Sequence, residues 1–211
     1  MITLYRKFVR NCNRLRCKAD AIYSLPANHQ DWRFRFASVN LISELWQAWC
    51  RLCRGVILFS CAGSVRRNGT VLLPRPTDNR WQRIAYEVNE YGHGRIPTRT
   101  RICRYLSEEP TWGDTNLLVR SIPHLGISNS AQLITAFGIS AQSPSHLQIV
   151  RNACYHLNIE TMNRVRSLLP FYVGTVRQHP SELIWCLDGN TRCDAFYCWL
   201  EELGVIAELA T

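Results

Sequence analysis

The hexapeptide Arg151-Asn152-Ala153-Cys154-Tyr155-His156 combines residue types that can cleave RNA without a metal ion. Such cleavage needs a base that takes the proton of a ribose 2′-hydroxyl, and histidine titrates in the right pH range. It also needs a fixed positive charge at the scissile phosphate, which the guanidinium group of Arg151 can supply. Asn152 could orient either group or bind a phosphate oxygen. We therefore take Arg151, Asn152 and His156 as the candidate catalytic residues.

No competing catalytic motif occurs in the sequence. It contains no Gly-rich phosphate loop, no HExxH and no GxSxG. The acidic residues are scattered, so they do not predict a two-metal nuclease site. Cys50 and Cys53 form a CxxC, but no second CxxC follows at zinc-ribbon spacing. We expect reduced, buried thiols there and neither a metal nor a cofactor, although a zinc site remains the alternative that metal analysis would test.

The charge of the chain favours a polyanionic partner. Its 211 residues contain 25 basic and 16 acidic side chains, for a net charge of +9. All but two of the basic residues are arginine, the exceptions being Lys7 and Lys18. Guanidinium groups bind phosphates in two-point geometry and stack on bases, so we expect a nucleic acid to be the partner. A G+C-rich genome would explain the ratio of Arg to Lys, but it explains the net charge less well.

The periodicity of apolar residues predicts a mainly all-α fold. Residues 3–23 carry one apolar stripe with basic residues beside it, and Pro26 and Asn28 should end that helix. Ser38 should cap a second helix over 39–60. From Asp114 onward the pattern is that of successive helices with short connections, which favours an antiparallel helical bundle. Their expected ranges are 117–122, 130–137, a helix that starts at Ser143, 158–172, and 192–203 ending at Gly204.

The N-terminal half should also contain segments that are not helical. Trp32-Arg33-Phe34-Arg35-Phe36 alternates strictly, which predicts a short extended segment. Residues 63–113 are loop-rich, with a short strand over 70–73 and a helix over 81–91. We therefore divide the chain into a basic helix and extended arm (1–37) and a helical domain (38–211), within which 63–113 is a possible insertion.

Spacing restricts how the candidate catalytic residues can meet. Five residues on an ideal helix separate two side chains by roughly 140°. Arg151 and His156 therefore converge only if the helix distorts or ends between them, or if a second subunit supplies one of the two.

Arg-Asn-x-x-x-His between two helices resembles the R-x(4–6)-H signature of HEPN-domain ribonucleases. The resemblance covers residues 114–211, with the helix predicted over 39–60 as a further candidate segment. It implies a helical bundle that forms a homodimer, with Arg and His of both subunits lining one cleft. It further implies metal-independent RNA cleavage to a 2′,3′-cyclic phosphate and a 5′-hydroxyl, by a toxin or antiviral-defence effector with an antitoxin or defence-complex partner. Arg151 would stabilise the phosphate, His156 would act as acid or base, and Asn152 would be the auxiliary polar residue.

Asn158 departs from one HEPN subgroup, which has Tyr two residues after the His as the target of inactivating modification. That mode of control is therefore not expected.

The alternative function is a helical RNA- or DNA-binding module, or a subunit of a defence complex, without chemistry of its own. No apolar run reaches the ~20 residues of a membrane span, and the basic N-terminus lacks the apolar region of a signal peptide. We accordingly expect a cytoplasmic chain that makes no contact with membranes.

Overall fold

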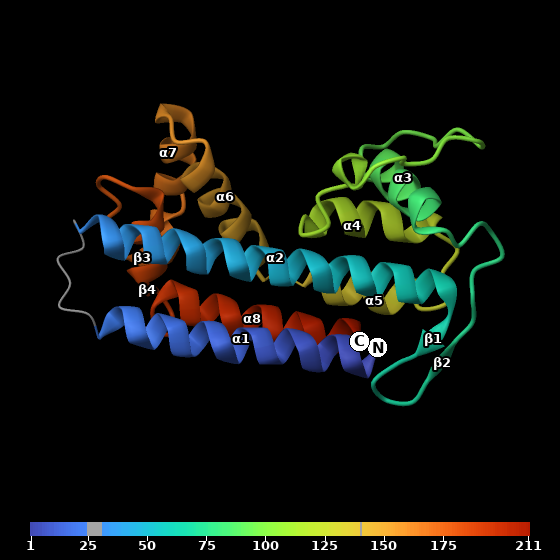
Figure 1. Ribbon diagram of the computed structural model, residues 1–211, viewed down its shortest axis with the longest axis horizontal. Coiled ribbons are helices and arrows are strands. Elements are labelled where there is room, and N and C mark those ends of the chain that lie inside the picture. The colour runs from blue at the N-terminus through green and yellow to red at the C-terminus, as the bar shows by residue number, and fades with distance from the viewer. Residues whose placement is uncertain (25–30, 140) are drawn as a thin grey trace. The chain divides into compact units, whose positions relative to one another are not determined.

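Helices form where buried apolar residues recur at three- and four-residue spacing. In the first helix, for example, Phe8, Leu15 and Ala19 are buried while the basic residues Arg10 and Arg14 are exposed. The computed structural model describes residues 1–24, 31–139 and 141–211, and these are predominantly helical, which confirms the all-α prediction. The helices are α1 (Ile2–Tyr23), α2 (Trp32–Ala62), α3 (Trp81–Gly92), α4 (Thr115–Ser121), α5 (Ser130–Gly138), α6 (Ser143–Tyr155), α7 (Ile159–Arg166) and α8 (Ala195–Ala210) (Figure 1).

Two small antiparallel hairpins accompany the helices. Strands β1 (Ser64–Val65) and β2 (Val71–Leu72) pair with Ser64 opposite Leu72. Strands β3 (Tyr172–Val173) and β4 (Leu187–Asp188) pair with Tyr172 opposite Asp188. Short 3₁₀ segments lie at Leu106–Glu108, Ile122–His124, Leu169–Phe171 and Pro180–Trp185.

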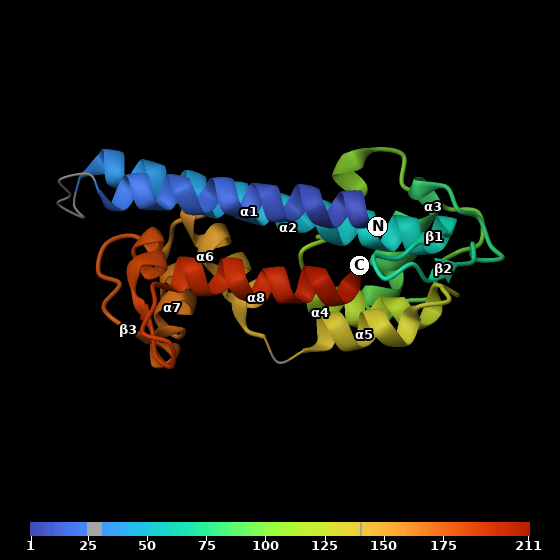
Figure 2. The same ribbon diagram turned by 90° about the horizontal axis from the view of Figure 1, so that it is seen from below.

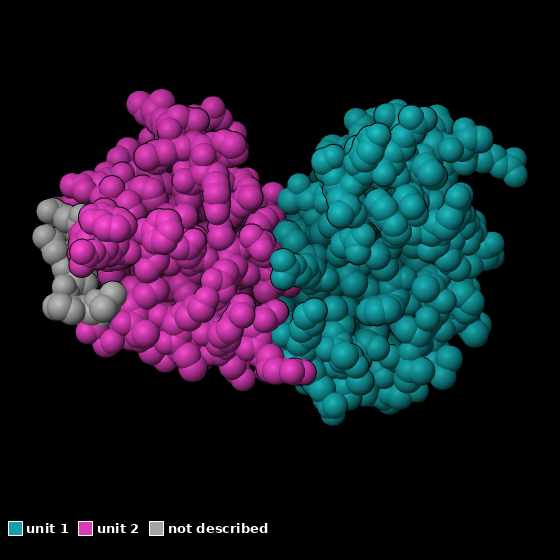
Figure 3. Space-filling view, in the orientation of Figure 1, with its two compact units in different colours: residues 1–8, 49–141, 205–211 teal, residues 9–48, 142–204 magenta. Residues whose placement is uncertain are grey.

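The chain divides into two compact units (Figure 3). Unit 1 comprises residues 1–8, 49–141 and 205–211, and unit 2 comprises residues 9–48 and 142–204. Helices α1, α2 and α8 contribute residues to both units.

In unit 1, α4 packs against both α3 and α5, and α2 contacts α5 through Trp49. Trp49 of α2 is completely buried, and its ring meets that of Phe137 edge-on at a centroid distance of 6.3 Å. Its indole Nε1 donates to the carbonyl of Gly113 at 3.0 Å. This satisfied buried Trp anchors the segment before α4 to α2.

In unit 2, residues of α1 and α2 lie side by side on antiparallel helices (Figure 1 and Figure 2). Arg14 and Lys18 of α1 both pair with Glu44 of α2. On α8, the Tyr197 hydroxyl donates to the Asp20 carboxylate of α1 at 2.5 Å. Three helical segments of unit 2 thus lie together, at residues 9–23, 32–48 and 195–204, and α6 and α7 complete the unit.

Several predicted boundaries of the helices are wrong. Trp32–Phe36 is the first part of α2 and not an extended segment, because Phe34 is buried against Trp185 at a centroid distance of 5.3 Å. Ser38 is consequently an interior residue, and its hydroxyl donates to the Phe34 carbonyl rather than capping the helix. The boundary predicted between residues 37 and 38 falls inside α2.

The predicted ends of the last two helices also differ from the structure. Helix α7 ends at Arg166, and the chain continues through a 3₁₀ turn that contains Pro170 into strand β3. Helix α8 runs through Gly204 to Ala210, because buried Ile206 and Ala207 extend its apolar face.

Three other predictions concern the N-terminal half. The helices over 3–23 and 81–91 are confirmed as α1 and α3, and the strand over 70–73 contains β2. The break assigned to Pro26 and Asn28 lies outside the described residues. Within the described ranges, no helix combines the length and the apolar character that a membrane crossing requires.

Candidate functional site

Helix α6 carries the candidate catalytic residues at its C-terminal end. Leu147, Val150 and Ala153 are buried and hold the helix in unit 2. At the other end of α6, the hydroxyl of Ser143 donates to the Glu202 carboxylate of α8 at 2.5 Å. With one face of α6 buried in this way, the side chains of Arg151 and Asn152 are left partly exposed and that of Tyr155 is exposed.

The guanidinium group of Arg151 is held from two sides. Its Nη1 donates to Oδ1 of Asn152 at 3.1 Å, and its Cζ lies 4.7 Å from the ring centroid of Tyr155. The Tyr155 hydroxyl in turn lies 2.5 Å from Oγ of Ser43 on α2. A cation over a tyrosine ring gains about 0.5–1 kcal/mol at an exposed site. Arg151 is therefore positioned through Tyr155 by a contact between α6 and α2.

His156 lies at the corner between α6 and α7 with its side chain exposed. Its backbone N–H donates to the Asn152 carbonyl at 2.9 Å, and its own carbonyl accepts from the hydroxyl of Thr161 at 2.8 Å. Asn158 begins α7 with a reciprocal capping box to Thr161. These bonds fix the backbone of the corner on both sides of His156.

Arg151 and Asn152 are in contact, but His156 does not join them. Its N–H still makes the helical bond to Asn152, but its own backbone angles (φ −126°, ψ 59°) are not helical, so α6 ends between Arg151 and His156. Among the described residues, no hydrogen bond links Arg151 to His156. Within a single chain, the guanidinium group is thus held by Asn152 and Tyr155 and not by the imidazole.

Apolar side chains around His156 are exposed to solvent. Tyr155 is 53% exposed, Leu157 54% and Ile159 80%. These three residues lie in one short stretch of chain that includes His156, so the corner between α6 and α7 presents apolar groups together with the imidazole.

Two neighbours of the motif contribute structure rather than chemistry. Burial raises the pKa of the Cys154 thiol to about 12, so this group stays protonated near neutral pH and is no nucleophile. His146, on the same helix, is buried with its Nδ1 at 2.6 Å from the Tyr172 hydroxyl, which also accepts from Nε1 of Trp199 at 2.9 Å. Burial lowers the pKa of His146, which keeps the ring neutral inside this network.

Within the ranges that the structure describes, no group of three or more His, Cys, Asp or Glu side chains could hold a metal ion. Cys50 and Cys53 lie on α2, and Cys53 is completely buried, which raises the pKa of its thiol well above the ordinary value.

Tyr155 and Ser43 are the residues of this site that the sequence did not indicate. Arg151 and Tyr155 are four residues apart and therefore share a helix face, which is the signal that could have paired them. Nothing in the local sequence connects Ser43 to Tyr155, because this contact joins residues 112 positions apart.

Comparisons with family models, curated proteins and solved structures found no match for this chain. Its function is therefore inferred from the residues of the site alone.

Proposed function

We propose that this chain is a metal-independent RNA endonuclease of the HEPN type, with Arg151, Asn152 and His156 as its catalytic residues. The observation that carries the proposal is the corner between α6 and α7, where a guanidinium held by Asn152 and Tyr155 lies five positions before an exposed histidine. A cation that is held in place before the substrate arrives stabilises developing charge without reorganising during the reaction. The proposal includes a role as a toxin or antiviral-defence effector, controlled by an antitoxin or a defence-complex partner.

In the proposed reaction, the strand is cut by its own ribose. His156 takes the proton of the 2′-hydroxyl, and the 2′-oxygen forms a bond to phosphorus while the bond from phosphorus to the 5′-oxygen breaks. A protonated imidazole then gives the departing 5′-oxygen its proton. The products are a 2′,3′-cyclic phosphate and a 5′-hydroxyl, and Arg151 balances the charge that builds on the phosphate oxygens.

A second copy of the chain would complete the active site. Within one chain, no hydrogen bond among the described residues joins Arg151 to His156, whereas two copies could pair the arginine of one with the histidine of the other. The exposed Leu157 and Ile159 beside His156 are the apolar groups that such a contact would cover. The proposal therefore includes a homodimer built around the ends of α6.

Cleavage of RNA by purified protein tests the proposal. Arg151→Ala and His156→Ala should each lower the rate at least 100-fold, since a general base or a charge-stabilising donor typically contributes that much. Arg16→Ala on α1 and His93→Ala after α3 remove the same residue types from exposed positions elsewhere and should leave the rate unchanged. Circular dichroism would check that all four variants retain the fold.

The chemistry of the cut separates this mechanism from others. Cleavage should persist in EDTA and should stop when the nucleotide on the 5′ side of the cut carries 2′-deoxyribose, because the internal nucleophile is then missing. Cutting that requires a divalent ion would refute the mechanism. Salt-sensitive RNA binding by the parent protein, without any cyclic phosphate product, would instead identify a non-catalytic binding module.

A further inference from the structure

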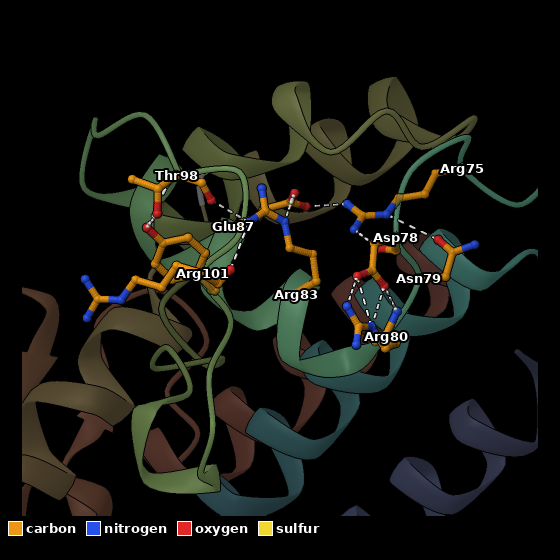
Figure 4. A network of polar contacts seen from close by, with 9 residues as sticks. Arg75, Asp78, Asn79, Arg80, Arg83, Glu87, Thr98 and Arg101 are labelled. Carbon is orange, nitrogen blue, oxygen red and sulfur yellow. Dashed lines mark hydrogen bonds and ion pairs between the residues drawn. The ribbon is translucent and has the colours of Figure 1, made fainter.

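Unit 1 contains a buried ionic cluster that holds a basic loop in place (Figure 4). Arg75 and Arg83 share the carboxylate of Glu87, with N–O distances of 2.5 and 2.7 Å. The side chains are nearly buried, at 1% exposure for Arg75, 11% for Arg83 and 10% for Glu87. The nearby carboxylate of Asp78 is bound by Arg80 instead. Two guanidinium groups on one carboxylate leave the cluster with a net positive charge.

Arg83 also fixes the backbone of the segment that follows α3. Its Nη1 donates to the carbonyls of Thr98 and Arg101, at 2.6 and 2.9 Å. The Tyr86 hydroxyl accepts from the backbone N–H of Thr98, and the N–H of Cys103 donates to the carbonyl of Gln82 on α3. Residues 98–103 contain no helix or strand, so these bonds to α3 set their conformation.

The fixed segment presents arginines to solvent. Arg99, Arg101 and Arg104 are exposed, and among the described residues none of them forms an ion pair with a carboxylate. The guanidinium group of Arg101 lies 5.6 Å from the ring centroid of Tyr86, which holds it close to the segment. These arginines are thus available to an external anion, and the order of the backbone lowers the entropy lost on binding.

A hollow of about 480 Å³ lies beside Arg101 and Arg104. It is lined by Thr100, Arg101, Ile102, Arg104, Tyr105 and Glu108. Tyr105 is 67% exposed and offers a ring face at the edge of the basic surface. Glu108 is the acidic group of the lining, and its carboxylate accepts from the backbone N–H of Arg104 at 2.7 Å. That bond offsets part of the negative charge that would otherwise oppose an anion.

We propose that Arg99, Arg101, Arg104 and Tyr105 form a binding surface for single-stranded RNA. The three exposed guanidinium groups would contact phosphates of the strand, and the exposed ring of Tyr105 would stack on an unpaired base. A duplex offers no free base face to that ring, so the strand bound here is single. The choice of RNA over DNA rests on the proposed function, whereas the location of the surface does not.

Fluorescence anisotropy with a labelled 2′-O-methyl RNA 12-mer tests the surface without cleavage. The triple variant Arg99→Gln, Arg101→Gln, Arg104→Gln should bind at least tenfold more weakly. The slope of log affinity against log salt should become shallower by about 2, because single strands give about 0.7 per phosphate contact. The matched control is Arg6→Gln, Lys7→Gln, Arg10→Gln on α1, which removes the same charge from exposed positions and should bind as the parent does.

Tyr105→Ala provides a second variant that leaves every charge in place. It should weaken binding at least fivefold with an unchanged salt slope, as expected for the loss of one stacked base. Equal losses of affinity in both triple variants would show that net charge alone determines binding, and this would refute the proposed surface. Preference for duplex RNA or for anionic lipid vesicles over the single strand would refute it as well.

The two proposals can fail separately. If the arginine triple variant loses binding of the 12-mer but the parent cleaves no RNA, the surface stands and the nuclease assignment falls. If the parent cleaves RNA and the triple variant cleaves it with the same KM, the nuclease assignment stands and the surface falls.

Discussion

At the scale of single residues, the candidate site depends on how Arg151 is held. The sequence already indicated Arg151, Asn152 and His156, because their types and spacing suit phosphodiester chemistry. The four-residue spacing could have indicated that the ring of Tyr155 lies beneath the guanidinium group, but nothing could indicate that Ser43 fixes the Tyr155 hydroxyl. The second of these contacts is made between residues far apart in the sequence, so no local pattern records it.

Two substitutions of Tyr155 separate the roles of its ring and its hydroxyl. Tyr155→Phe keeps the ring beneath Arg151 and loses only the contact with Ser43, so we expect kcat to fall less than threefold. Tyr155→Ala removes both, and kcat should fall about fivefold, which corresponds to the roughly 1 kcal/mol of a partly exposed cation–π contact. Single-turnover cleavage rates would measure this. Equal effects of the two variants would show that the ring does not position Arg151.

Buried His146 should make stability depend on pH. Burial lowers its pKa below the ordinary 6.5, although the nearby carboxylates of Glu202 and Asp188 act in the opposite direction. The unfolded chain therefore binds the proton first as the pH falls. The stabilising contribution is complete above pH 6.5 and is lost as the pH falls from there toward the lower pKa of the folded state.

Urea unfolding between pH 5 and pH 8 measures this dependence. The free energy of unfolding should rise with pH across the window just below 6.5, and His146→Gln should reduce that rise while retaining a partner for the Tyr172 hydroxyl. Burial also lowers the pKa of His179, so the pH profile of His179→Asn is compared with that of His146→Gln. If the pH profile of His146→Gln is the same as that of the parent, His146 does not titrate as inferred.

At the scale of elements, apolar periodicity predicted which segments are helical but not where each helix ends. Alternation over Trp32–Phe36 favoured an extended segment, yet Phe34 packs against Trp185, a contact between distant parts of the sequence. Gly204 suggested a helix end, yet buried residues on either side of it keep α8 continuous. In both cases, tertiary packing outweighed the local preference.

Two helical glycines differ in the space that their surroundings leave for the methyl group of an alanine. At Gly92, the last residue of α3, a Cβ atom would overlap the side chain of Leu117 on α4. Gly92→Ala should therefore lower the free energy of unfolding by about 1–3 kcal/mol, the usual effect of overpacking. At Gly204, within α8, nothing lies within 4 Å of the added atom. Gly204→Ala should raise the free energy of unfolding by about 0.5–1 kcal/mol, because alanine favours a helix over glycine.

Chemical denaturation of both glycine variants would measure these changes. Since the two substitutions add the same atom, opposite signs would isolate the packing of α3 on α4 as the cause. A stabilising Gly92→Ala would mean that Leu117 moves aside at little cost and that α3 and α4 are less tightly packed than their contact indicates.

At the scale of the whole molecule, the proposed nuclease requires two chains. Helix α6 ends at Tyr155, between Arg151 and His156, and among the described residues no hydrogen bond joins the two side chains. Sequence spacing left open whether the two residues converge at such a helix end or across two subunits. It could not predict the exposed Leu157 and Ile159 next to the histidine, because their exposure depends on how α6 and α7 pack in unit 2.

Mixing two inactive variants tests whether the active site is shared. Arg151→Ala retains His156, and His156→Ala retains Arg151, so a dimer of one copy of each contains a single intact pair if each pair spans two chains. After equal mixing and exchange, half of the dimers are mixed and half of their sites are intact, which predicts about a quarter of the parental cleavage activity. An active site within one chain predicts none, and activity that stays at the level of the separate variants would refute the shared site.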